Sequence, residues 1–189
     1  NKLTSTDIIN KKQQALDLFK KSSFNKVIDL LNQVILEDKV KDPMSFFLLG
    51  TSYLYERNLE LAEKNLKISI DQNKNYYNSN HNLGVTLQLK ENLDEALVSF
   101  KNALKLKPNN LGTLNHIAEC YEKIKSFEDA KKYYNKVIEI EPNNKIALKG
   151  LSRIFLKFGY HKQGLEYLQK SSGLLRFTEK DFKIITWKD

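Results

Sequence analysis

A sequence period of 34 residues constrains this chain more than any other feature. The stretch HNLGVTLQLKENLDEALVSFKNALKLKPNN at 81–110 is followed, 34 residues on, by NHIAECYEKIKSFEDAKKYYNKVIEIEPNN. Residues of similar size keep this step without drift: Gly50, Gly84 and Ala118; Ala62, Ala96 and Ala130; Leu66, Phe100 and Tyr134; Leu49, Leu83, Ile117 and Leu151; Pro108 and Pro142. A repeat of this length predicts a supersecondary unit that stacks on copies of itself.

Each unit contains two helical patterns. In the third unit, apolar residues recur at helical spacing over 83–89 and over 93–104, and the polar stretch 90–92 joins the two runs. A connection this short predicts antiparallel neighbours. Gly84 and Ala96 would let the two backbones approach closely, and Pro108 would end the unit because proline cannot continue a helix. The low content of glycine (seven) and proline (three) agrees with a helix-rich fold.

The third unit carries a recognisable motif: Asn80-x2-Leu83-Gly84-x2-Leu87, then Ala96-x3-Phe100, then Pro108. This motif resembles the tetratricopeptide repeat (TPR) family, whose 34-residue unit is a helix–turn–helix. Two positions differ from the residues that the family often has: Asn80 stands where tryptophan is common, and Leu87 where tyrosine is common. In the fourth unit, the residue that corresponds to Leu87 is Tyr121. The resemblance implies an all-α, right-handed α-solenoid of about five TPR-like antiparallel helix pairs with a short C-terminal capping helix.

The same frame predicts how the chain is divided. It gives an N-terminal lead-in at 1–7, a TPR solenoid at 8–178 with units 8–41, 43–76, 77–110, 111–144 and 145–178, and a capping segment at 179–189. The terminal units depart most from the pattern, as the caps of a stack do. Gly164 stands where alanine is usual, so we expect Gly164→Ala to be neutral or mildly stabilising. The tail could instead begin a further domain of a larger enzyme.

The sequence offers no constellation that predicts an active site, a cofactor site or a metal site, so we expect a protein that is not an enzyme. His116 and Cys120 lie four residues apart on one predicted helix, but no third orienting group accompanies them. With His81 they match no zinc-ligand spacing. The single cysteine favours a cytoplasmic location, and no apolar run reaches the roughly 20 residues of a membrane span.

The resemblance points to the first helix of each unit as the lining of a concave groove that holds partners. The residues predicted to bind a partner there are Phe47, Tyr55, His81, Asn82, Asn115, Lys149, Arg153 and Lys157. In the fifth unit, Lys145 and the last three of these cations recur every four residues with no acid between them. Like charges at that spacing repel. We therefore expect this end of the groove to seat acidic residues of the partner.

The implied function is that of a protein-interaction module or scaffold that captures a partner peptide or helix in its groove. The alternative is a non-catalytic TPR accessory domain of a larger enzyme. The net charge of +8 also raises nucleic-acid binding. However, the lysines are interleaved with acids along the predicted helix faces, which favours a solvated surface. Another protein is therefore the expected partner.

Overall fold

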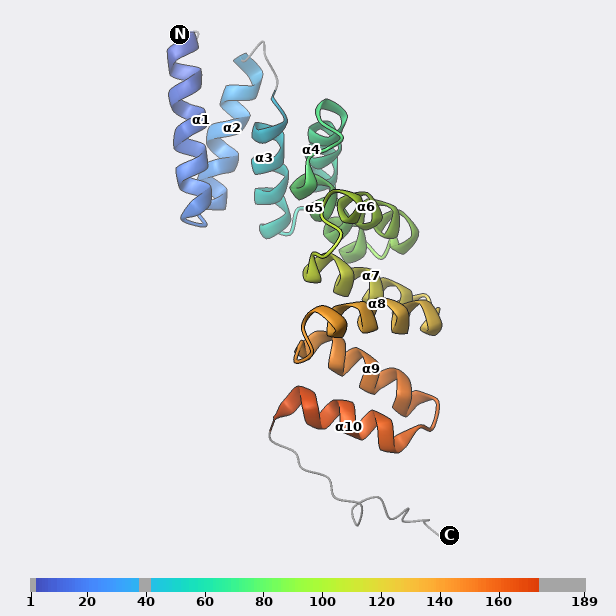
Figure 1. Ribbon diagram of the computed structural model, residues 1–189. Coiled ribbons are helices and arrows are strands. Elements are labelled where there is room, and N and C mark those ends of the chain that lie inside the picture. Colours follow the sequence, from blue (N-terminus) through green and yellow to red (C-terminus); the bar gives the residue numbers. More distant parts are fainter. Residues whose placement is uncertain (1–2, 38–41, 174–189) are drawn as a thin grey trace, which may run out of the picture. The chain divides into compact units, whose positions relative to one another are not determined.

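The computed structural model describes residues 3–37 and 42–173 (Figure 1). These residues form ten α-helices and no strand, which confirms the predicted all-α fold. The helices are α1 (Ser5–Lys20), α2 (Phe24–Glu37), α3 (Pro43–Tyr55), α4 (Leu59–Gln72), α5 (Tyr77–Leu89), α6 (Leu93–Leu106), α7 (Leu111–Lys123), α8 (Phe127–Ile140), α9 (Lys145–Lys157) and α10 (His161–Ser172). They belong to two compact units, Asn1–Pro108 with α1 to α6 and Asn109–Asp189 with α7 to α10.

Consecutive helices pack as antiparallel pairs: α1 with α2, α3 with α4, α5 with α6, α7 with α8 and α9 with α10. The first helices of successive pairs also contact one another, α1 with α3 and α3 with α5 in the first compact unit, and α7 with α9 in the second. These are the TPR-like helix pairs that the resemblance implied. The boundaries of the five sequence units stay predictions, and the capping segment 179–189 lies outside the described residues.

The same turn closes every helix pair. The second residue after the end of each first helix has a left-handed φ between 55° and 79°; these residues are Ser22, Arg57, Glu91, Lys125 and Gly159. The amide of the following residue donates to the carbonyl five residues earlier, at 2.9 Å in all five turns. This is the Schellman cap, which satisfies carbonyls left over at the helix end. Four of the five residues are not glycine, and each holds a conformation that costs an L-residue roughly 1–2 kcal/mol.

Short polar side chains begin several of the first helices. Asn110 and Asn144, which end the repeated PNN motif, each accept through Oδ1 the backbone N–H three residues on, at 2.9 and 3.1 Å. Asp42 accepts the N–H of Ser45 at 2.8 Å and the Nζ of Lys12 at 2.6 Å. Burial of the Asp42 carboxyl opposes its ionisation, but the hydrogen bonds from Lys12 and Ser45 outweigh burial and lower its pKa. These caps fix where the first helices start.

Small residues face large ones where the paired helices meet. A Cβ added to Gly50 would lie 2.8 Å from Cγ of Leu66, and one added to Gly84 would lie 2.6 Å from the Phe100 ring. Separations this short leave no room for a methyl group. The predicted close approach at Gly84 is therefore confirmed.

The same geometry overturns the expectation for Gly164. A Cβ at this position would lie 2.6 Å from Cγ of Leu156 and 3.1 Å from its backbone nitrogen. Neither atom is the free end of a flexible side chain, so the α9–α10 pair would have to shift apart. The prediction that Gly164→Ala is harmless was wrong because it counted helix propensity and not the contact across the pair.

A polar network that runs from a buried tyrosine to an exposed arginine joins α7, α8 and α9 in the second compact unit. The Tyr134 side chain is fully buried, and a Cβ on Gly150 would lie 2.2 Å from its ring. Its hydroxyl donates to Oε2 of Glu122 at 2.9 Å, and Arg153 donates to both oxygens of Glu122 at 2.8 Å. Burial and the Glu122 charge raise the pKa of Tyr134, and the hydrogen bond to Glu122 raises the pKa of Arg153. Glycine at 150 gives the tyrosine room to reach the ion pair.

We predict that Gly164→Ala lowers the free energy of unfolding by roughly 1–3 kcal/mol, the usual cost of overpacking a close contact. Urea unfolding monitored by circular dichroism measures the change. Gln163→Ala, at the exposed neighbouring position of α10, is the matched control and should shift stability by less than about 0.5 kcal/mol. Equal midpoints for Gly164→Ala and the wild type would show that the α9–α10 contact is looser than described.

We predict that Lys125→Gly raises the free energy of unfolding by about 0.5–1 kcal/mol. Glycine adopts the left-handed conformation of this turn without steric strain, which stabilises the folded state. It also raises the conformational entropy of the unfolded chain, which opposes folding, but we expect this effect to be the smaller one. The reverse change, Gly159→Lys, introduces the strain at the equivalent turn and should destabilise by a similar amount. Thermal unfolding of the two variants side by side measures both signs. Lys125→Gly at or below wild-type stability contradicts the prediction.

We predict that Tyr134→Phe destabilises the chain by about 1–3 kcal/mol, since it removes a hydroxyl that donates to a charged, partly buried carboxylate. Tyr160→Phe, at an exposed tyrosine, should change stability by less than about 0.5 kcal/mol. Urea unfolding of both variants provides the comparison. A neutral Tyr134→Phe would mean that Arg153 alone satisfies Glu122.

Candidate functional site

An open hollow lies between α3 and α5, the first helices of two successive pairs. It has a volume of about 330 Å³, and its lining residues are Leu54, Tyr55, Arg57, His81, Asn82, Val85 and Leu89. Three of these, Tyr55, His81 and Asn82, are among the residues predicted to bind a partner. The hollow therefore gathers predicted residues from two helices onto one surface.

Two residues at the end of α3 give the hollow its chemical character. The Tyr55 side chain is 62% exposed, and its ring stacks on Phe24 at a centroid distance of 4.3 Å with 5° between the planes. Stacking holds the ring in place while one face stays available. Arg57 is exposed at the turn that follows, and its guanidinium forms no ion pair with any residue of the described ranges. The hollow thus combines a fixed aromatic ring with an unneutralised positive charge.

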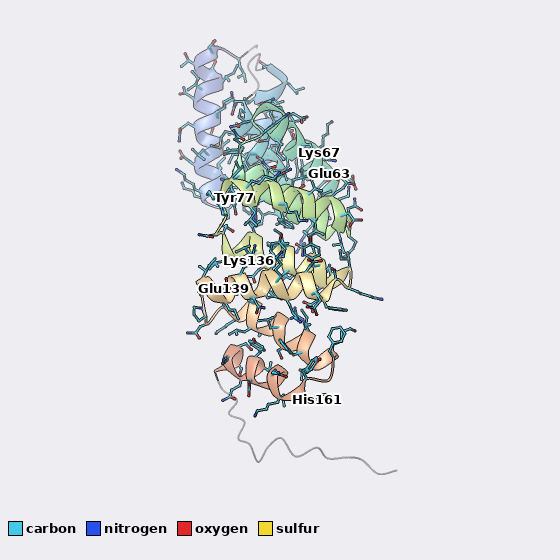
Figure 2. The ribbon with its side chains drawn as sticks, turned by 45° about the vertical axis from the view of Figure 1, so that its right-hand side comes forward. Glu63, Lys67, Tyr77, Lys136, Glu139 and His161 are labelled. Atoms are coloured by element: carbon cyan, nitrogen blue, oxygen red, sulfur yellow. The ribbon has the colours of Figure 1, made fainter. Side chains whose placement is uncertain are left out.

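The α5 side of the hollow is held by contacts within the protein. Asn82 donates through Nδ2 to Oγ1 of Thr51 at 2.9 Å, which ties α5 to α3. The His81 ring stacks with Tyr77 at 5.7 Å and meets the Phe100 ring edge-on at 5.6 Å; Tyr77 is labelled in Figure 2. Both side chains are half-buried. They form a rigid wall, and little of either is free to reorganise around a ligand.

Phe47 lies in the core and not in the hollow. Its side chain is only 9% exposed and contacts the rings of Phe19 at 6.0 Å and Tyr76 at 5.3 Å. Those contacts join α1, α3 and the residue before α5. As the structure stands, Phe47 stabilises the packing of successive first helices and presents almost no surface to a partner.

In the second compact unit, Asn115 is also buried, with 4% of its surface exposed. Its Nδ2 donates to Oδ1 of Asn144, the cap of α9, at 3.2 Å. Its own Oδ1 is buried without a hydrogen-bond partner among the described residues. The contact with the α9 cap assigns Asn115 a structural part in joining α7 to α9.

The cations of α9 differ in how they are used. Arg153 donates through Nε and Nη2 to the two carboxylate oxygens of Glu122. The positive charge of Arg153, which has no acidic neighbour within α9, is therefore neutralised by an acid of α7. Lys149 and Lys157 are exposed, and the Lys157 ammonium lies over the Phe127 ring at 5.3 Å. Arg153 is exposed but neutralised by Glu122, so the uncompensated positive charge of this helix comes from its lysines.

The described residues contain no group of three or more His, Cys, Asp or Glu side chains that could hold a metal ion. Cys120 is fully buried, and His116 contacts Glu119 at 3.5 Å. Cysteines buried in this way are generally structural. His161 is exposed at the start of α10 (Figure 2). No helix in the described part of the chain is both long and apolar enough to cross a membrane.

Four residues that line the α3–α5 hollow were not among those predicted to bind a partner: Leu54, Arg57, Val85 and Leu89. Val85 and Leu89 occupy the same repeat positions as Thr51 and Tyr55, one period later, so the repeat frame itself held the signal. Arg57 had no such signal. It lies in the turn after α3, and only its left-handed backbone brings it to the rim.

Comparisons with known proteins agree with this architecture. The tetratricopeptide repeat family matches residues 87–155. Among solved structures, MamA 41-end from Desulfovibrio magneticus RS-1 is 14% identical with a TM-score of 0.81, over 88% of this chain and 94% of that one. MamA of AMB-1 is 15% identical with a TM-score of 0.80, over 90% and 93%. A further MamA structure is 16% identical with a TM-score of 0.79, over 90% and 97%. No curated protein matches the sequence.

The two kinds of likeness cover different parts of the chain. The family match runs from the end of α5 into α9, while the structural match takes in most of the chain. At 14–16% identity the structural likeness shows the fold alone. Residues 87–155 match the tetratricopeptide repeat family, and the helix pairs on either side of that segment share the fold of the MamA structures.

Proposed function

We propose that this protein is an interaction module that captures a segment of another protein on the first helices of its repeats. The observation that carries the proposal is the α3–α5 hollow, in which an exposed ring, apolar side chains and an unpaired cation converge from two successive repeats. Such a mixture matches a peptide that inserts one apolar side chain and places an acid beside it.

Each side chain that lines the hollow can contact one part of such a peptide. Leu54, Val85 and Leu89 offer an apolar lining for the inserted side chain, and the Tyr55 ring offers a flat face to pack on it. Rigid aromatic surfaces make good anchors because they lose little conformational entropy on binding. Arg57 would pair with a carboxylate of the partner through its planar fork.

The second compact unit contributes separately through Lys149 and Lys157. Their exposure on α9 suits acidic residues of the same kind of partner. Arg153 is a poor choice for testing this, because reversing its charge would place a second carboxylate beside Glu122 and the buried Tyr134. The lysines are therefore the residues to change.

The test uses a displayed library of random 12-residue peptides, selected on the immobilised chain, with dissociation constants measured by fluorescence anisotropy. We predict that part of the selected peptides share an apolar residue next to Asp or Glu. Tyr55→Ala and Arg57→Glu should each raise their Kd by about tenfold or more, and Lys149→Glu with Lys157→Glu should mainly slow association.

Matched controls are available on the same chain. Tyr160→Ala removes a ring of similar exposure, and Lys162→Glu reverses an exposed charge on α10; neither residue lines the hollow. Both should leave the Kd within about twofold of the wild type. Selected peptides that bind Tyr55→Ala and Arg57→Glu as tightly as the wild type would refute the proposal.

A further inference from the structure

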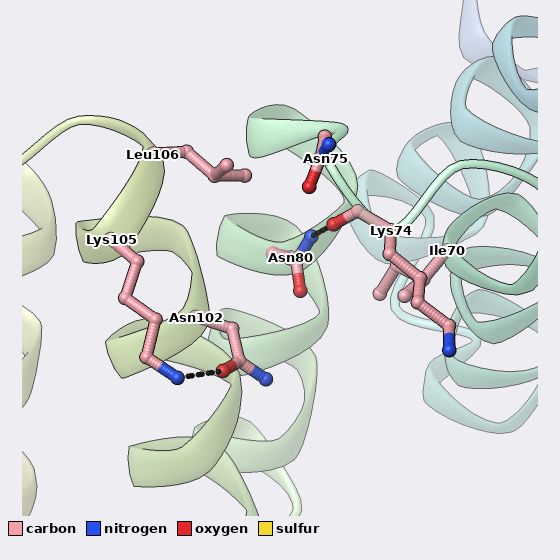
Figure 3. Close-up of a pocket in the computed structure, with 7 residues that line it drawn as sticks. All are labelled: Ile70, Lys74, Asn75, Asn80, Asn102, Lys105 and Leu106. Atoms are coloured by element: carbon pink, nitrogen blue, oxygen red, sulfur yellow. Dashed lines mark hydrogen bonds between the residues drawn. The ribbon is translucent and has the colours of Figure 1, made fainter.

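A second hollow lies on another face of the first compact unit, between α4 and α6. Its volume is about 440 Å³, and it is lined by Ile70, Lys74, Asn75, Asn80, Asn102, Lys105 and Leu106 (Figure 3). None of these residues lines the α3–α5 hollow. The inference drawn from it does not depend on the function proposed above.

This hollow coincides with a break in the repeat. At the position of Asn80, the preceding unit has Phe46 and the two following units have Leu114 and Leu148, and all three side chains are buried. The family, too, often has a large aromatic residue there. Asparagine is smaller than phenylalanine or leucine and is polar. The sequence departs from its own pattern at the residue that lines the hollow from α5.

The Asn80 side chain is held in one orientation. Its Nδ2 donates to the carbonyl of Lys74 at 3.1 Å and to that of Tyr76 at 3.0 Å, so the amide cannot turn over without losing both bonds. The residue is only 3% exposed. Its Oδ1 has no hydrogen-bond partner in the described part of the chain and points into the hollow (Figure 3). An acceptor held in a fixed orientation is thus presented to whatever occupies the space.

The opposite wall presents donors. Lys105 donates through Nζ to Oδ1 of Asn102 at 3.3 Å, which leaves the Asn102 amide hydrogens for another acceptor. Lys74 and Lys105 bring two positive charges, and no acid is among the lining residues. An occupant that satisfies this site must donate to Asn80, accept from Asn102 and carry negative charge.

We propose that the α4–α6 hollow binds an extended, acidic peptide segment and reads its backbone through Asn80 and Asn102. A peptide unit offers one N–H and one C=O, which complement an asparagine acceptor on one wall and an asparagine donor on the other. Acidic side chains on either side of that unit pair with Lys74 and Lys105. Inorganic phosphate and a nucleic-acid backbone offer acceptors only and would give the Asn80 Oδ1 no donor.

The test takes acidic peptides from the same library selection and measures their Kd on four variants. Asn80→Leu and Asn102→Ala should each weaken one class of peptide by about tenfold, and Lys105→Glu by at least as much. Tyr55→Ala should leave that class unchanged, which separates this site from the α3–α5 hollow. Circular dichroism shows whether each variant is folded. If Asn80→Leu does not fold, Asn102→Ala and Lys105→Glu, which change exposed residues, still test the site.

Recognition of the peptide backbone can be tested directly by N-methylation. Replacing the peptide N–H groups one at a time by N-methyl should weaken binding strongly at one position, and that penalty should disappear in Asn80→Leu, since the acceptor is then gone. Tripolyphosphate and a single-stranded oligonucleotide serve as acceptor-only probes. The proposal fails if no acidic peptide is sensitive to Asn80→Leu or Asn102→Ala. It also fails if the polyanions bind as tightly as the peptides and depend on the lysines but not on Asn80.

Discussion

The structure depends on one constraint, the contact of a small residue with a large one where helices cross. Gly50 lies against Leu66 and Gly84 against Phe100, each at a separation that excludes a methyl group. Since residues of this kind recur at the 34-residue step, successive helix pairs can pack in the same way. Gly150 shows that the glycine can also serve the contact between pairs, because it admits Tyr134 from α8 against α9.

The packing of the paired helices determines the geometry of the turns that connect them. Close helices of fixed orientation leave one way to connect them, the Schellman cap with a left-handed residue, and the packing holds that conformation even where the residue is serine, arginine, glutamate or lysine. A non-glycine residue at this place carries a side chain out of the turn. At Arg57 that side chain reaches the rim of the α3–α5 hollow. Backbone strain and a candidate binding group thus coincide in one residue.

Much of the fold could be predicted from the sequence, and the site only in part, for a physical reason. The period, the small residues and the prolines report contacts between neighbouring helices, which repeat and leave a trace in the sequence. Tyr55, His81 and Asn82, which the same frame put on the first helices of two units, line one hollow, and their role in binding stays a prediction. Phe47 and Asn115 follow the frame equally well but are buried. Repeat position tells which helix a residue belongs to, and the size of its neighbours decides whether it reaches solvent.

Departures from the period carry the information that the period itself cannot. Glu122, Tyr134 and Arg153 build an ion-pair network that no earlier unit reproduces residue for residue, and its hydrogen bonds give Arg153, a residue predicted to bind a partner, a structural role. Asn80 does the reverse: a position that other units fill with a buried apolar side chain becomes a polar wall. A stack of identical repeats would offer the same surface to every partner. Specific recognition therefore has to come from positions such as Asn80 and Arg57, where one unit differs from its neighbours and the fold tolerates the change.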